Sequence, residues 1–173
     1  RTIDFAIKDE KIFINKTHVS LLSALLSILE TKNNPLSLDK ICKILEQSNF
    51  YNKKVNKESV YNALNRLDET VTIDWHVWGF KRHISYKEHE WPDIQNACRK
   101  FLKNLGHQSG AGFIFREVRK IFPQLVSKYE LVYIIKKSNE IIDLGFFNFG
   151  LSSWNVDERI KIADVINNIF KDD

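Results

Sequence analysis

The chain is poor in the residues that mark several classes of protein. It has no methionine, two cysteines, six glycines and three prolines among 173 residues. So few glycines and prolines exclude collagen-like and low-complexity chains. A content of 43% hydrophobic and 28% charged residues excludes a disordered tail. The lack of methionine is expected of a processed chain or of a fragment of a longer one, and the length allows one large domain or two small ones.

Long apolar runs are also missing. The most apolar stretch, residues 19–29, is interrupted by three serines and falls far short of the roughly 20 residues that cross a bilayer. The first fifteen residues alternate charged and apolar side chains, unlike a signal segment. We therefore expect a cytoplasmic protein without membrane contact. Cys42 and Cys98 suit buried, reduced thiols, with a single disulfide between them as the alternative.

The excess of basic over acidic residues is small. There are 26 lysines and arginines against 22 aspartates and glutamates, which gives a formal net charge of +4. Such a balance permits nucleic-acid binding without requiring it, because binding depends on how basic residues cluster on one face.

The hydrophobic pattern of the first half predicts a strand pair, three helices and a second hairpin. Alternation predicts a β-hairpin within residues 3–14. Helical spacing then predicts helices over residues 18–31, 37–45 and 57–67, the first of them deeply buried. Ser37 and Asn56 are the expected N-caps of the second and third helices. Alternation over residues 71–77, a turn near Gly79 and a return through Ile84 and Tyr86 predict the second hairpin.

The second half repeats this order of elements. A helix over residues 94–105 is expected to stop at Gly106, and a second helix to end at Pro123. A capping box from Ser127 to Glu130 opens a third helix, and residues 141–151 form a hairpin. A last amphipathic helix is predicted over residues 156–170, with more apolar surface than one small domain buries, so it packs across both halves or forms a dimer contact.

These elements predict an α+β fold, mostly helical with short β-hairpins. Three helices closed by a hairpin are the winged form of the helix-turn-helix arrangement. We therefore predict two winged helix-turn-helix domains, at residues 1–90 and 91–173, with the boundary in the charged stretch before Pro92.

Both halves resemble known winged-helix families. The first half, through its strand pair, three helices and hairpin, resembles the effector domains of OmpR-type response regulators, although its loop at residues 47–55 is longer than a tight helix-turn-helix turn. The second half carries IIDLG at residues 141–145 and FGLSSW at residues 149–154. Through these it is similar, over about residues 94–154, to the winged-helix domain of the delta subunit of bacterial RNA polymerase and to related HARE-HTH domains. The resemblance implies a module of transcription or of DNA modification and restriction systems.

The predicted third helix of the first half carries side chains suited to double-stranded DNA. Lysine and arginine neutralise phosphates, and serine, asparagine and arginine hydrogen-bond base edges. We expect this helix in the major groove, with a basic wing beside it. The candidate phosphate contacts are Lys53, Lys54, Lys57, Lys81 and Arg82, and the candidate base contacts are Ser59, Asn62, Asn65 and Arg66. A solvated helix face is the competing interpretation of the same residues.

The second half offers a weaker set of candidates. Its third helix presents Lys128, Tyr129, Lys136 and Lys137 outward and leaves Tyr133 undecided. Glu130 on the same helix weakens a phosphate contact. Arg116, Arg119 and Lys120 form a further basic edge.

Aromatic residues support an alternative function. Trp75, Trp78 and Phe80 are expected to be core or hydrophobic cover rather than base-stacking groups. Phe146, Phe147 and Phe149 cannot all be buried on one face of so short a hairpin. Exposed aromatics would favour a protein-interaction module that docks on a larger complex or forms a homodimer.

Catalytic patterns are weak. Asp93 with the segment 117–120 only superficially matches a metal nuclease, and His76, His83 and His89 lack zinc-ligand spacing. The Gly110–Gly112 loop lacks the lysine of a phosphate loop. We therefore expect no enzyme, no catalytic residue, no metal site and no cofactor.

Overall fold

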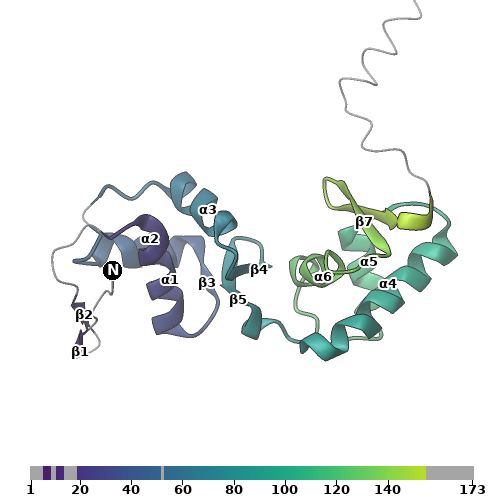
Figure 1. The fold of residues 1–173 in the computed structure, drawn as a ribbon, viewed down its shortest axis with the longest axis horizontal. Helices are drawn as coiled ribbons and strands as arrows, with labels where there is room; N and C mark the ends of the chain where they lie inside the picture. The colour runs from purple at the N-terminus through teal and green to yellow at the C-terminus, as the bar shows by residue number, and fades with distance from the viewer. Residues whose placement is uncertain (1–5, 9–10, 14–18, 52, 155–173) are drawn as a thin grey trace, which may run out of the picture. The chain divides into compact units, whose positions relative to one another are not determined.

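The chain folds as an α+β protein with two compact units. The structure is a computed structural model that describes residues 6–8, 11–13, 19–51 and 53–154 (Figure 1). The units are Arg1–Ile84 and Ser85–Asp173. The sequence predicted a boundary after residue 90, whereas the two units meet between Ile84 and Ser85. Ser85 and Tyr86 are held by the second unit, because the Ser85 N–H donates to the Glu130 carboxylate and the Tyr86 hydroxyl accepts from the Gln124 N–H.

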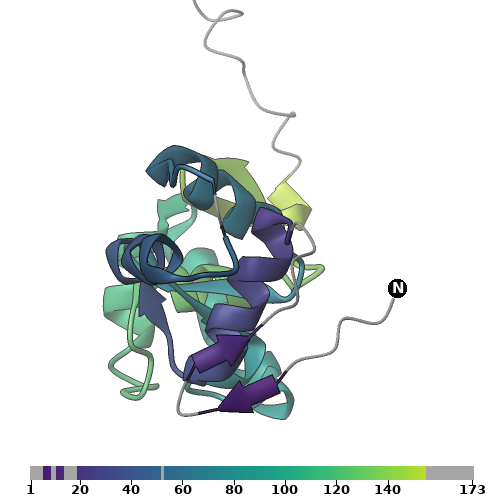
Figure 2. The same ribbon diagram turned by 90° about the vertical axis from the view of Figure 1, so that its left-hand side faces the viewer.

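The first unit contains the predicted three helices and two hairpins. The short strands β1 and β2 pair antiparallel and lie side by side in Figure 2. A three-stranded antiparallel sheet has the order β3-β5-β4. The elements are β1 (Ala6–Lys8), β2 (Lys11–Phe13), α1 (Leu21–Lys32), β3 (Leu36–Ser37), α2 (Leu38–Gln47), α3 (Lys57–Arg66), β4 (Thr70–Asp74) and β5 (Val77–Phe80). Strand β3 was not predicted, because two residues are too few to show an alternating pattern.

The helix termini follow local side-chain chemistry. Ser37 accepts a hydrogen bond from the Lys40 N–H and Asn56 accepts one from the Ser59 N–H, which confirms both predicted N-caps. Asn33 ends α1 in the left-handed conformation with φ 48°. Helix α1 is less buried than predicted, since it buries one stripe through Leu25, Leu29 and neighbouring residues while Leu22 stays 43% exposed.

The second hairpin turns earlier than predicted. Strands β4 and β5 are joined by Trp75 and His76, and Gly79 lies inside β5 opposite Val71. A Cβ atom on Gly79 would lie 2.7 Å from Nδ1 of His83, so the glycine permits a close approach of that imidazole and makes no turn. The expected return through Ile84 and Tyr86 is therefore wrong.

The basic pair Lys81 and Arg82 is also displaced from its expected position. Both residues belong to a short 3₁₀ helix, Lys81–His83, that follows β5. They follow the last residue of β5, at the end of the hairpin that is far from its turn. The prediction of a basic wing tip is therefore wrong. The cause is the earlier turn, which moves every residue after Asp74 along the hairpin.

The second unit repeats the element order and the sheet topology of the first. Its antiparallel sheet has the order β6-β8-β7, which matches β3-β5-β4. The predicted architectural repeat is thereby confirmed at the level of element order. The elements are η2 (Glu88–Glu90), α4 (Trp91–Leu105), β6 (Ser109–Gly110), α5 (Ala111–Val118), α6 (Lys128–Ile135), β7 (Ile141–Gly145), β8 (Asn148–Leu151) and η3 (Ser152–Trp154). Gly106 ends α4 with φ 77°, as its position predicted.

Glu130 and the two cysteines differ in how deeply they are buried. Glu130, which the sequence identified as an acid on the third helix of the second half, is fully buried. Both cysteines are free thiols, Cys98 buried and Cys42 half-buried. Burial raises the pKa of the Cys98 thiol to about 12 and also raises the pKa of Cys42, so both thiols stay protonated at neutral pH. The predicted helix at residues 156–170 lies outside the described residues.

Candidate nucleic-acid interface

Helix α3 presents a polar face to solvent. Val60, Ala63 and Leu64 point into the core, which leaves the five predicted contact residues exposed. Asn62 and Arg66 lie one helical turn apart on this face. In the part of the chain that the structure describes, neither makes a side-chain hydrogen bond or an ion pair. The exposed residues are Lys57, Ser59, Asn62, Asn65 and Arg66, and Lys53 and Lys54 are exposed in the preceding loop.

Two residues of this face already have partners. The Lys57 ammonium lies 2.6 Å from Oδ1 of Asp39, which raises the pKa of Lys57 and lowers the pKa of Asp39. Lys57 can therefore reach a phosphate only by leaving this carboxylate. The side-chain carbonyl of Asn65 accepts a hydrogen bond from Nε1 of Trp78 at 3.3 Å. Ser59, Asn62 and Arg66 are thus better placed to read bases than Asn65.

An aromatic cluster lies beside this face. The Tyr61 ring on α3 meets Trp78 edge-on at 5.5 Å and His76 at 5.7 Å, and His76 lies 4.4 Å from Trp75. Trp78 is buried at 1% exposure, as predicted for it and for Phe80, whereas Trp75 is 67% exposed and contradicts the prediction. The sequence analysis did not identify Tyr61 and His76 as members of this cluster. The only signal in the sequence is that Tyr61 lies on α3 and that His76 follows the strand β4.

The basic residues after β5 pack on an aromatic ring. The Arg82 guanidinium lies 4.5 Å from the centre of the Phe80 ring, and Lys81 and Arg82 are both exposed. A cation over a ring keeps its charge available to an anion. These residues still offer positive charge, but from the base of the hairpin.

The equivalent helix of the second unit offers a narrower polar face. Leu131, Val132, Ile134 and Ile135 are all buried, and Lys136 and Lys137 follow the end of α6. The basic side chains of this region have neighbours of their own. Lys136 pairs with Asp143 at 2.8 Å, Lys137 lies 5.3 Å from the Tyr133 ring, and Lys128 lies 5.2 Å from the Tyr129 ring. This unit is therefore less suited to base reading than the first.

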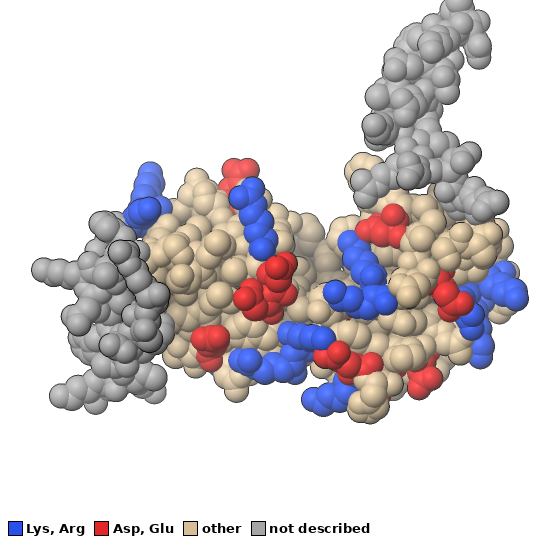
Figure 3. Space-filling view, viewed as in Figure 1, with Lys and Arg blue, Asp and Glu red and all other residues tan. Residues whose placement is uncertain are grey.

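Charge is mixed on the face that Figure 3 draws. On the face drawn, lysine and arginine side chains are interspersed with aspartate and glutamate side chains on each unit, and neither unit shows a broad basic surface in that view. On this face, attraction to DNA would depend on individual basic side chains more than on a broad positive field.

His83 makes the first unit sensitive to acid. Its Nδ1 accepts a hydrogen bond from the Phe80 N–H at 3.0 Å, which a protonated ring cannot do. Burial and then the Arg82 charge lower the pKa of His83. The unfolded chain, with an ordinary histidine pKa of about 6.5, therefore takes up the proton first as pH falls.

We therefore expect the free energy of unfolding to fall as pH drops below about 6.5, until the lowered pKa of the folded state is passed. Urea unfolding at several pH values measures this loss. The variant His83→Asn should show a smaller dependence, because a carboxamide oxygen accepts the same bond without titrating. His89→Asn, at an exposed histidine, is the control. An unchanged pH dependence in His83→Asn would contradict this role of His83.

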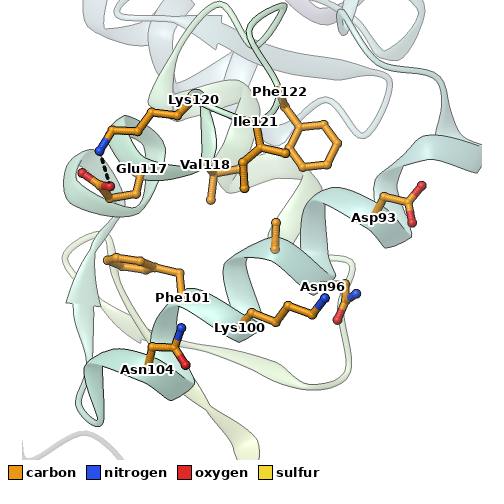
Figure 4. Close-up of a pocket in the computed structure, with 11 residues that line it drawn as sticks. Asp93, Asn96, Lys100, Phe101, Asn104, Glu117, Val118, Lys120, Ile121 and Phe122 are labelled. Carbon is orange, nitrogen blue, oxygen red and sulfur yellow. Dashed lines mark hydrogen bonds and ion pairs between the residues drawn. The ribbon is translucent and has the colours of Figure 1, made fainter.

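A groove in the second unit lies between α4 and residues 117–122. It encloses about 500 Å³ and has an apolar floor that includes Phe101, Val118 and Ile121 (Figure 4). Asp93 and Glu117, the carboxylates of the nuclease pattern, lie at opposite ends of it, and Glu117 pairs with Lys120. Ile121 is 68% exposed. This groove is the feature that the alternative function, protein docking, would use.

Among the described residues, no three side chains of His, Cys, Asp or Glu gather to hold a metal ion. In the same residues, no helix has the length and apolarity needed to cross a bilayer. No family model and no curated protein sequence matches the chain.

Proposed function

We propose that the chain is a pair of winged-helix domains and that the first binds double-stranded DNA through α3, as a regulatory or targeting module of a transcription or DNA-restriction system. The element order supports this proposal. Each unit has helix, strand, helix, helix and hairpin around a three-stranded antiparallel sheet. In helix-turn-helix proteins the recognition helix enters the major groove, and the proposal gives this role to α3, the helix that precedes the hairpin.

The exposed pair Asn62 and Arg66 is the observation that carries this proposal. Asparagine can make two hydrogen bonds to the major-groove edge of adenine, and arginine can make two hydrogen bonds to that of guanine. Ser59 lies on the same exposed side of the helix and suits either a base or a phosphate. Lys53 and Lys54 precede the helix and supply phosphate contacts that hold it in register.

A binding assay with mixed-sequence duplex DNA tests the proposal. We expect Asn62→Ala and Arg66→Ala to weaken binding to the preferred sequence by about 5- to 150-fold each and to relax sequence preference. Lys53→Ala, at a candidate phosphate contact, should instead weaken binding to all duplexes alike and reduce the slope of log affinity against log salt by about 1, whereas Asn62→Ala should leave the slope unchanged. Melting temperatures should stay close to that of the wild type, because these side chains are exposed.

Lys103→Ala and Asn104→Ala, at exposed positions of α4, remove the same charge and the same amide elsewhere. They should leave sequence preference intact. Binding that ignores Asn62 and Arg66, or that does not weaken as salt rises, would contradict the proposal.

A further inference from the structure

Each unit has an exposed aromatic side chain at the same position of its hairpin, β4–β5 in the first unit and β7–β8 in the second. The pairing of Asp74 with Val77 recurs as Gly145 with Asn148, so two residues form the turn in each unit. The first turn residue is Trp75, 67% exposed, in one unit and Phe146, 89% exposed, in the other. The two units share few residues elsewhere, so this shared feature calls for a physical reason.

Stability of the hairpin does not supply that reason. The second turn residue of each hairpin, His76 and Phe147, has a positive φ, and Phe146 has one as well, at 50°. Glycine and asparagine adopt such angles at little cost, whereas a bulky aromatic is a rare choice. Exposed rings also gain little from burial in the folded chain. The residues that are costly for the turn are His76, Phe146 and Phe147, and their presence points to a role of the turns in binding. For Trp75 the argument is its exposure alone.

The surroundings of the turns indicate what they bind. In the second unit Tyr129 meets the Phe147 ring at 5.6 Å, and the Lys128 ammonium lies 5.8 Å from that ring. In the first unit His76 lies against Trp75 and Tyr61. In the first unit the exposed Trp75 ring is therefore backed by the His76 ring, and in the second unit a ring and a lysine lie beside Phe147, next to the exposed Phe146. A flat exposed ring with such neighbours suits stacking on a base.

The first turn also adjoins the helix that we propose reads DNA. Tyr61 lies on α3, one residue before Asn62, and its ring contacts His76 of the turn. Figure 1 shows the β4–β5 hairpin next to α3. A nucleic acid held on the α3 face would therefore pass close to Trp75.

We infer that Trp75, and at the equivalent position Phe146, stack on a nucleobase that is unpaired or lifted out of its helix. For Trp75 this inference rests on the proposed DNA binding by α3. The His76 ring lies 4.4 Å from the Trp75 ring and limits its motion, so a base can stack on Trp75 without ordering a loose side chain first. The site then distinguishes a duplex with an unpaired base from a perfect one.

A matched set of oligonucleotides tests this inference. The probes are one labelled duplex, the same duplex with a single bulged base, and its single strand, measured by fluorescence anisotropy at constant salt. The wild type should bind the bulged duplex more tightly than the perfect one. Trp75→Ala should weaken binding to the bulged duplex by about 5- to 150-fold and to the perfect duplex by less than about twofold. Trp75→Phe should keep most of the preference, because it keeps a ring.

Phe113→Ala removes an exposed ring of α5 and serves as the control, and Phe146→Ala repeats the test in the second unit. An equal loss on both duplexes, or no loss with an unchanged melting curve, would overturn the inference for Trp75. A change in oligomeric mass without any change in oligonucleotide binding would also overturn it, because the turn would then serve a protein contact.

The two proposals fail separately. If Arg66→Ala weakens duplex binding and Trp75→Ala has no effect, DNA binding by α3 stands and base stacking falls. If single-strand and bulge binding depend on Trp75 while Arg66→Ala has no effect on any probe, base stacking stands and duplex reading by α3 falls.

Discussion

Trp78→Ala should lower the free energy of unfolding of the first unit by about 3–5 kcal/mol. The side chain is 1% exposed and belongs to the hydrophobic core formed with α1, α2 and α3. Its removal opens a cavity in that core and also removes the Nε1 bond to Asn65 and the edge contact with Tyr61. Urea unfolding followed by circular dichroism measures the loss.

Trp75→Ala is the matched control, because it removes the same side chain from the same hairpin at 67% exposure. It should change the free energy of unfolding by less than about 0.5 kcal/mol. Similar losses in the two variants would mean that Trp75 is part of the core and would also remove the basis for its proposed role in stacking.

Glu130→Ala should lower the free energy of unfolding of the second unit by about 2–6 kcal/mol, because two backbone N–H groups lose their acceptor at about 1–3 kcal/mol each. The Glu130 side chain is fully buried, and its two carboxyl oxygens accept from the backbone N–H groups of Ser85 and Val126 in partly buried hydrogen bonds. Because Ser85 begins the second unit, we also expect faster proteolysis at the boundary of the two units, which limited digestion measures.

Glu130→Gln should show an intermediate loss of about 1–3 kcal/mol, since one oxygen remains while an amide donor faces the other N–H group. Glu140→Ala, at an exposed glutamate that pairs with Arg99, should cost less than about 1 kcal/mol. If Glu130→Ala were as mild as Glu140→Ala, the buried carboxylate would not hold the boundary segment.

The helices and their ends could be read from the chain because they depend on neighbours a few residues apart. Ser37, Asn56 and Ser127 cap helices through bonds to N–H groups two or three positions ahead, and Gly106 adopts the positive φ that ends α4. The outward face of α3 followed from the same local period, so Asn62 and Arg66 were identified correctly as exposed. Local spacing was also enough to predict the α+β class and the repeated order of elements.

Packing decided the rest. A glycine by itself indicated a turn at Gly79, but in the folded chain Gly79 leaves room for the His83 imidazole inside β5, and the turn lies at Trp75 and His76. Glu130 matched an ordinary capping box, but it also accepts a hydrogen bond from the N–H of Ser85, 45 residues away. A periodic pattern samples only a few residues, so it could not show that contact. The sequence order therefore determined which helices and strands form and which side of α3 faces solvent, whereas packing across the fold determined where the hairpin turns, which acid is buried and which aromatic rings remain exposed.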